Sequence, residues 1–188
     1  MARALIAALC LLLTQSIYAE SLFNEAGFRV KRFRAPLAKV HPDAITLNAQ
    51  TLHELLQQTE PPVLIDVQAI TVRPESELFG RVWLPSFKRR NIPGSIWLPN
   101  IGYPELEPWM QRFLERGLET FAPDPSKPVV FYCVADCWLS WNAIIHAKHL
   151  GYSKLYWLAE GSDGWEVAGF ELTSAEPIEI DDLIGDGN

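Results

Sequence analysis

The chain has 188 residues and a formal net charge of −7. Its hydrophobic content of 48% and charged content of 21% are ordinary for one folded domain with a real core, and they exclude collagen-like, repetitive and wholly disordered chains. An acidic chain of this kind is poorly suited to nucleic acid, so we expect no nucleic-acid partner.

Residues 1–19 have the pattern of a secretory signal peptide. Arg3 gives a positive start, residues 4–13 form an unbroken apolar run, and a more polar stretch ends at Ala19. A retained N-terminal anchor is the alternative, but the apolar run is short for a bilayer, and no later segment is long enough to cross one. We therefore expect export and no transmembrane segment in the mature chain, whose net charge becomes about −8 when Arg3 is lost (15 basic against 23 acidic).

Residues 20–49 are expected to form an N-terminal extension. Within it, residues 28–36 alternate apolar and basic side chains, which is typical of an edge strand or an extended arm. The next segment begins with Thr51 and has Glu54 three residues later, a capping box that predicts a short helix over 52–58.

Short apolar runs and helical patterns then alternate along the chain. The expected strands are VLIDV at 63–67, a brief strand within 92–99, VVFYC at 129–133 and KLYWL at 154–158. The expected helices are one that starts near Pro108, one over 138–150 that ends at Gly151, and a short one after residue 160. This order predicts an α/β domain over 50–170 with a mainly parallel sheet.

Two segments do not fit this alternation. Residues 68–91 lack clear periodicity, and we expect a long loop there, which in a compact domain is often functional. Residues 171–188 carry six acids and no base, and we expect a loosely held acidic C-terminal tail.

Cys133 stands out because it ends an apolar strand and its loop leads into a helix. Open parallel sheets bind ligands beyond the carboxyl ends of their strands, and a helix N-terminus favours the reactive thiolate. Cys133 is therefore a candidate nucleophile, with a buried and inert cysteine as the alternative.

Cys137 lies four residues later and, with Cys10 in the leader, completes the three cysteines of the chain. The pair supports a structural disulfide, a redox couple that opens and closes, or a sulfur or oxidised adduct on Cys133 that Cys137 resolves. Two cysteines do not complete a zinc site, and His146 and His149 lie several turns further on, so we expect no metal site.

Three more side chains are candidates near this pair. Trp138 and Trp141 anchor the helix in the core, or Trp138 instead shields the sulfurs and offers a stacking face. Asp66, at the end of its strand, is a candidate catalytic acid, but such an acid more often caps a neighbouring loop, and we favour that role.

Several segments in order resemble the rhodanese family: LIDV (64–67), NIPGSIWLP (91–99), PVVFYC (128–133), LGYSKLYWLAEG (150–161) and Trp165. The resemblance implies a five-stranded, mainly parallel sheet with helices on both faces. It also implies that Cys133 is the cysteine that carries a persulfide in sulfur transfer. The following binding loop of Val134, Ala135, Asp136 and Trp138 would form an anion cradle of backbone N–H groups.

This loop departs from the family pattern at two positions. Asp136 stands where the family usually has glycine, and Trp138 where it has arginine or another polar residue. A carboxylate repels a dianion in a partly dry pocket, so we do not expect ordinary thiosulfate sulfurtransferase activity.

A narrower likeness rests on the leader, FNEAGFRVKRFRAP, IPGSIWLPN and CVADCWLSWNA. These resemble the secreted rhodanese-like proteins called PQQ-dependent catabolism-associated CXXCW motif proteins, although the spacing here is Cys-x-x-x-Cys-Trp. The resemblance implies a periplasmic role beside a quinoprotein alcohol dehydrogenase or its cytochrome, and PQQ enters only through it. Three hypotheses follow: a thiol redox or accessory protein for this system, a sulfurtransferase with a persulfide on Cys133 and a partner other than thiosulfate, and a non-catalytic binding module with a structural disulfide.

Overall fold

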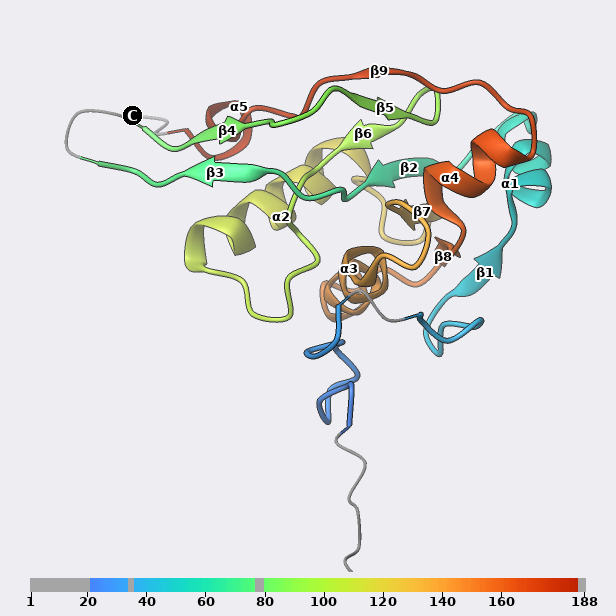
Figure 1. The fold of residues 1–188 in the computed structure, drawn as a ribbon, viewed down its shortest axis with the longest axis horizontal. Helices are drawn as coiled ribbons and strands as arrows, with labels where there is room; N and C mark the ends of the chain where they lie inside the picture. Colours follow the sequence, from blue (N-terminus) through green and yellow to red (C-terminus); the bar gives the residue numbers. More distant parts are fainter. Residues whose placement is uncertain (1–20, 34–35, 77–79, 186–188) are drawn as a thin grey trace, which may run out of the picture.

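A computed structural model describes residues 21–33, 36–76 and 80–185, so the predicted signal peptide lies outside the described residues. Its centre is a five-stranded sheet of order β1-β8-β7-β2-β6, in which every neighbouring pair is parallel (Figure 1). The strands are β1 (Ile45–Leu47), β2 (Val63–Asp66), β6 (Ile96–Trp97), β7 (Val129–Tyr132) and β8 (Leu155–Leu158). The predicted α/β fold with a five-stranded parallel sheet is confirmed.

Alternating side chains of the central strands feed two hydrophobic layers, one on each face of the sheet. Leu64 and Val130 join one layer, while their neighbours Ile65 and Phe131 join the other, and all four are almost fully buried. Figure 1 shows the helices that cover these layers, α1 with α4 on one side and α2 with α3 on the other. Their bounds are α1 (Ala49–Leu56), α4 (Gly161–Val167), α2 (Pro108–Phe121) and α3 (Trp138–His149).

The expected long loop over 68–91 is wrong, because this segment contains three short strands. β3 (Thr71–Arg73) and β4 (Val82–Leu84) form an antiparallel pair, and β5 (Arg89–Asn91) pairs with β9 (Thr173–Ala175). Trp83 of β4 is buried, and its ring centroid lies 5.5 Å from that of Phe113 on α2. One large aromatic side chain thus holds a hairpin too short to show a periodic pattern.

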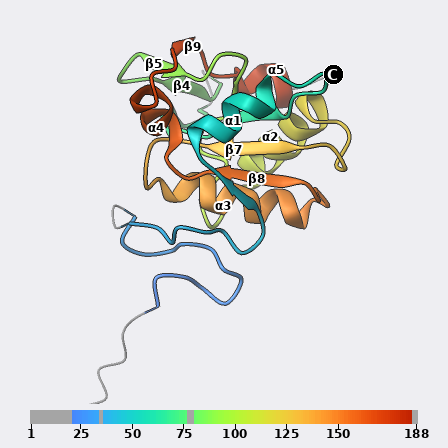
Figure 2. The same cartoon turned by 90° about the vertical axis from the view of Figure 1, so that its right-hand side faces the viewer.

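The expectation of a loosely held C-terminal tail is also wrong for the described residues. β9 pairs with β5, and α5 (Ile180–Ile184) packs beside α2 (Figure 2). Ile180 is buried, and the carbonyl oxygen of Ile178 accepts the indole N–H of Trp83 at 2.8 Å. The isoleucines between the acids dock this segment, while the acids remain at the surface.

The N-terminal extension also differs from the prediction in detail. α1 begins at Ala49, and the side chain of Asn48 accepts the N–H of Thr51 at 2.8 Å, so Asn48 replaces Thr51 as the cap. β1, which lies within this predicted extension, joins the main sheet, whereas residues 21–33 run beneath α3 (Figure 2). Arg29 and Asn142 of α3 exchange two hydrogen bonds, of 2.8 and 3.1 Å, so this arm is a docked segment rather than a strand of the main sheet.

Candidate functional site

Cys133 follows β7 directly and is fully buried. Its carbonyl oxygen accepts the N–H of Ser162 at 2.9 Å, at the beginning of α4. Gly161 has a φ of +60°, and a Cβ there would lie 2.5 Å from the same carbonyl oxygen. Only glycine allows α4 to approach so closely, and this approach holds the backbone of Cys133 in place.

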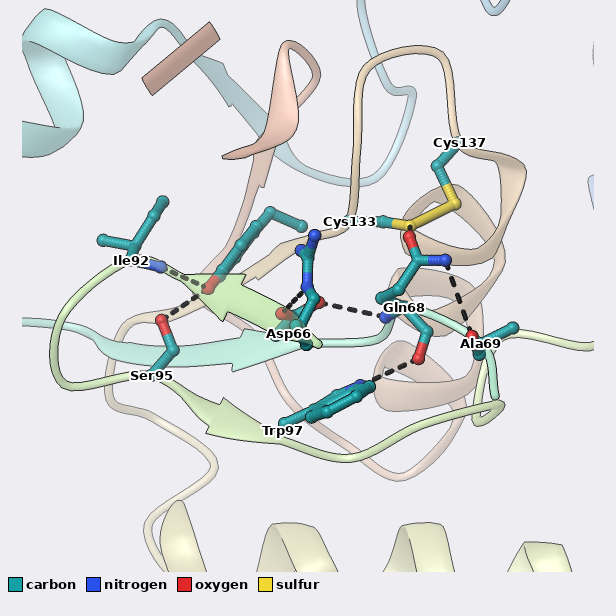
Figure 3. A network of polar contacts seen from close by, with 10 residues as sticks. Asp66, Gln68, Ala69, Ile92, Ser95, Trp97, Cys133 and Cys137 are labelled. Atoms are coloured by element: carbon teal, nitrogen blue, oxygen red, sulfur yellow. Dashed lines mark hydrogen bonds and ion pairs between the residues drawn. A yellow bond between two sulfur atoms is a disulfide. The ribbon is translucent and has the colours of Figure 1, made fainter. Parts of the chain in front are cut away.

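Cys133 and Cys137 are joined in a disulfide with a Cα–Cα distance of 5.9 Å (Figure 3). The loop between them turns at Asp136, which has a φ of +55°, and the N–H of Cys137 bonds to the carbonyl of Val134 at 3.3 Å. Cys137 is partly exposed and is the N-cap residue of α3. The structure therefore brings together the two thiols that the sequence placed four residues apart.

Gln68 touches the disulfide, and sequence reasoning missed it. Its Oε1 lies 3.1 Å from Cys133 Sγ, and its Nε2 faces the carbonyl of Ala69 at 3.5 Å (Figure 3). The Gln68 carbonyl accepts the indole N–H of Trp97 at 2.8 Å. A disulfide sulfur has no proton, so the contact with Cys133 becomes a hydrogen bond only in the thiol form. Its position two residues after Asp66, beyond the carboxyl end of the neighbouring strand, was the available signal.

Asp66 is fully buried at the end of β2 and has two partners. Its Oδ1 accepts the N–H of Gln68 at 3.0 Å, and its Oδ2 lies 2.8 Å from Nε of Arg89, whose side chain is 7% exposed. Burial raises the pKa of Asp66, and the Arg89 guanidinium opposes that shift. Asp66 thus caps the loop that carries Gln68, the role that the sequence favoured.

The loop after Cys133 is flanked by carboxylates. The N–H of Ala135 donates to Asp163 Oδ2 at 3.2 Å, so one N–H of the expected anion cradle already has an anionic partner. Asp136 is exposed beside it. Both line a groove of about 1030 Å³, together with Glu160 and the apolar side chains of Val40 and Val167. This environment disfavours a dianionic substrate.

The two tryptophans after Cys137 have different roles. The centroid of the Trp138 ring lies 4.1 Å from that of Phe33 and 5.4 Å from that of Tyr103, and both neighbours are exposed. Trp138 therefore forms an aromatic cluster with Phe33 and Tyr103 at the surface, directly after Cys137. Trp141 is buried, donates its indole N–H to the carbonyl of Gly27 at 3.1 Å, and anchors α3 in the core.

The histidines of α3 contribute to packing. Phe28 packs between His146 and His149, and Nε2 of His146 lies 2.8 Å from the carbonyl oxygen of Tyr103. Among the described residues, no cluster of three or more His, Cys, Asp or Glu side chains is placed to hold a metal ion. The same residues include no helix long and apolar enough to cross a membrane.

Comparisons with known proteins place the fold. The model of the rhodanese-like domain matches residues 48–168. A thiosulfate sulfurtransferase from Pseudomonas aeruginosa is 23% identical, with a TM-score of 0.45, and the match covers 71% of this chain but only 21% of that one. A polysulfide-sulfur transferase homodimer from Wolinella succinogenes is 22% identical, with a TM-score of 0.44, over 69% of this chain and 78% of that one.

A rhodanese-like domain from Anabaena is 17% identical, with a TM-score of 0.46, and the match covers 78% of this chain and 86% of that one. No curated protein matches the chain.

Proposed function

Because the chain belongs to the rhodanese-like domain family, with the family model over residues 48–168, we propose that it is a thiol–disulfide exchange protein built on that fold. In this proposal the Cys133–Cys137 pair cycles between a disulfide and two thiols. The disulfide across the loop after β7 is the observation that carries the proposal.

The position of this disulfide favours a working couple over a staple. The two cysteines are four residues apart, and so short a loop gains only about 2 kcal/mol of stability from its closure in the chain-entropy model. The loop also lies beyond the carboxyl end of β7, where open parallel sheets bind ligands. A structural disulfide between distant elements would close a longer loop and stabilise the fold more, and it would have no reason to lie at the ligand-binding edge of the sheet.

Transfer of sulfur from thiosulfate is disfavoured by the same loop. Asp163 occupies the N–H of Ala135, and Asp136 adds a second carboxylate nearby. A persulfide on Cys133, formed with a sulfur donor other than thiosulfate, is the second candidate function. It is favoured by the burial of Cys133 at the end of β7, because a dry site protects a sulfur adduct from water.

We further propose that the protein works in the periplasm, beside a quinoprotein alcohol dehydrogenase or its cytochrome. The signal-peptide pattern of residues 1–19 and the likeness to CXXCW motif proteins support this proposal. PQQ itself carries several carboxylates, whereas the groove beside the loop between the two cysteines is lined by Asp136, Glu160 and Asp163. These residues do not fit PQQ, so we assign the groove no part in binding it. Fractionation of the native host tests the location, which fails if the chain stays with the cytoplasmic marker.

Intact-mass spectrometry tests the exchange function. The oxidised chain should be lighter by two hydrogens than the reduced chain, through repeated cycles, and should gain no sulfur from thiosulfate. Cys133→Ser and Cys137→Ser are the matched controls, because neither can form the internal disulfide. Two free thiols that no oxidant joins would overturn the proposal, and a sulfur-sized gain from a donor other than thiosulfate that depends on Cys133 would favour the second candidate.

A further inference from the structure

We infer that Cys137, rather than Cys133, is the sulfur at which a partner thiol enters and leaves. This inference rests on the proposed exchange function and assigns the two sulfurs different parts in it. It reverses the order that the position of Cys133 at the strand end suggests.

The first argument is access to the sulfur atoms. Cys133 is 0% exposed, enclosed by the loop after β2 and by the beginning of α4, whereas Cys137 is partly exposed on the outer side of the loop. Thiol–disulfide exchange needs a thiolate to approach the attacked sulfur from the side away from the bond that breaks. Of the two cysteines, only Cys137 has surface exposed to solvent.

The second argument is the stability of each thiolate once the disulfide opens. Cys137 is the N-cap residue of α3, a helix of 12 residues, and its side chain makes no capping bond in the disulfide state. The unpaired N–H groups of the first turn favour an anion there. Cys133 is shielded from solvent, and its sulfur lies 3.1 Å from Gln68 Oε1, a side-chain amide oxygen that accepts an S–H proton but repels a thiolate.

The stability of the Cys137 thiolate also has an effect that opposes the argument from access. The better stabilised thiolate is also the better leaving group, which favours attack at Cys133. The rate depends only weakly on this difference in acidity, because the Brønsted coefficient is about 0.5. Complete burial of Cys133 outweighs that factor because it removes the line of approach altogether.

The exchange then runs in two balanced steps. A partner thiolate attacks Cys137 Sγ and forms a mixed disulfide, while the Cys133–Cys137 bond breaks and its electron pair goes to Cys133 Sγ. Cys133 Sγ takes up the proton that the first partner thiol released on ionising, and the resulting thiol donates a hydrogen bond to Gln68 Oε1. A second thiolate of the same partner attacks the partner sulfur of the mixed disulfide, and Cys137 leaves as a thiolate that takes up the proton released by this second partner thiol. The partner dithiol loses two electrons and two protons, which the pair gains, and the reverse reaction follows the same steps backwards.

Single-cysteine variants of the full mature chain test this assignment, with oxidised glutathione as the probe. Cys133→Ser leaves only Cys137, and Cys137→Ser leaves only Cys133. We expect mixed disulfide formation, followed by intact mass near neutral pH, to be at least about tenfold faster in Cys133→Ser, since burial and thiolate stability act together there. Equal rates, or a faster reaction in Cys137→Ser, would overturn the inference.

A second measurement uses the wild-type chain, so that misfolding of a variant cannot hide the answer. The reduced protein is treated briefly with a limiting amount of iodoacetamide, and the modified peptide is identified by mass. Alkylation should fall mainly on Cys137, and alkylation mainly on Cys133 would overturn the inference while leaving reversible exchange intact. If the wild-type pair does not cycle at all, the proposed function fails, whichever thiol reacts faster.

Discussion

Arg89→Met probes the buried ion pair that supports the loop carrying Gln68. Arg89 Nε lies 2.8 Å from Asp66 Oδ2, and the two side chains are 7% and 0% exposed. Removing one partner leaves a buried charge uncompensated, which typically costs about 3–5 kcal/mol. Arg90→Met is the matched control, because Arg90 pairs with Glu166 at 3.1 Å where both side chains are more than half exposed, and such pairs contribute less than about 1 kcal/mol.

The free energy of unfolding that Arg89→Met loses should increase with pH. Burial raises the pKa of Asp66, and the variant loses the Arg89 charge that opposes this shift. The folded state then holds the Asp66 proton more tightly than the unfolded chain, whose carboxyl titrates near pH 4. The stability deficit of Arg89→Met is therefore small below about pH 4 and grows as the pH rises through the folded-state pKa.

Urea unfolding at several pH values measures both effects. The double variant Asp66→Asn/Arg89→Met removes both charges and keeps an amide oxygen for the N–H of Gln68. It should recover most of the free energy of unfolding that Arg89→Met loses. The reasoning is refuted if Arg89→Met loses no more than Arg90→Met, or if the double variant is as unstable as the single one.

Three further predictions concern the same core. Gly161→Ala should cost more free energy of unfolding than Gly169→Ala, because both have positive φ but only the first would place a Cβ against the Cys133 carbonyl; equal losses would contradict this account of the close approach. Burial lowers the pKa of His41 to about 4, so stability should fall by up to about 3 kcal/mol as the pH drops from about 6.5 to 4, and His41→Gln should lack that fall when both are followed by thermal unfolding. Gln68→Leu removes a hydrogen bond that only the Cys133 thiol makes, so it destabilises the reduced form by roughly 0.5–1 kcal/mol. The midpoint potential of the pair should therefore fall by about 10–20 mV, and an unchanged potential would exclude this contact.

The central sheet could be predicted from the sequence because its strands are continuous apolar runs between helical patterns. VLIDV and VVFYC read as buried strands for the reason seen in the structure, which is that helices cover both faces. The position of Cys133 at a strand end followed from the same reading. A local sequence pattern is enough to predict a strand where burial on both faces alone requires apolar residues.

The rest depends on contacts between distant residues. The hairpin that contains Trp83 packs on α2 and is hydrogen-bonded to Ile178, which lies 95 residues later. Residues 173–175 form the strand β9 because they pair with β5. Gln68 has no special pattern of its own and gains its place at the sulfur from Asp66 and Trp97. Such partners are set by topology, which a single stretch of sequence does not contain.

The midpoint potential of the Cys133–Cys137 pair tests the central claim most directly. Equilibration of the purified mature chain in glutathione buffers of known ratio, with acid trapping and thiol counting, gives this value. A working exchange couple should have a potential above roughly −300 mV and two thiols that appear and disappear together. A disulfide that stays closed below roughly −300 mV would mark a structural bridge and contradict the account.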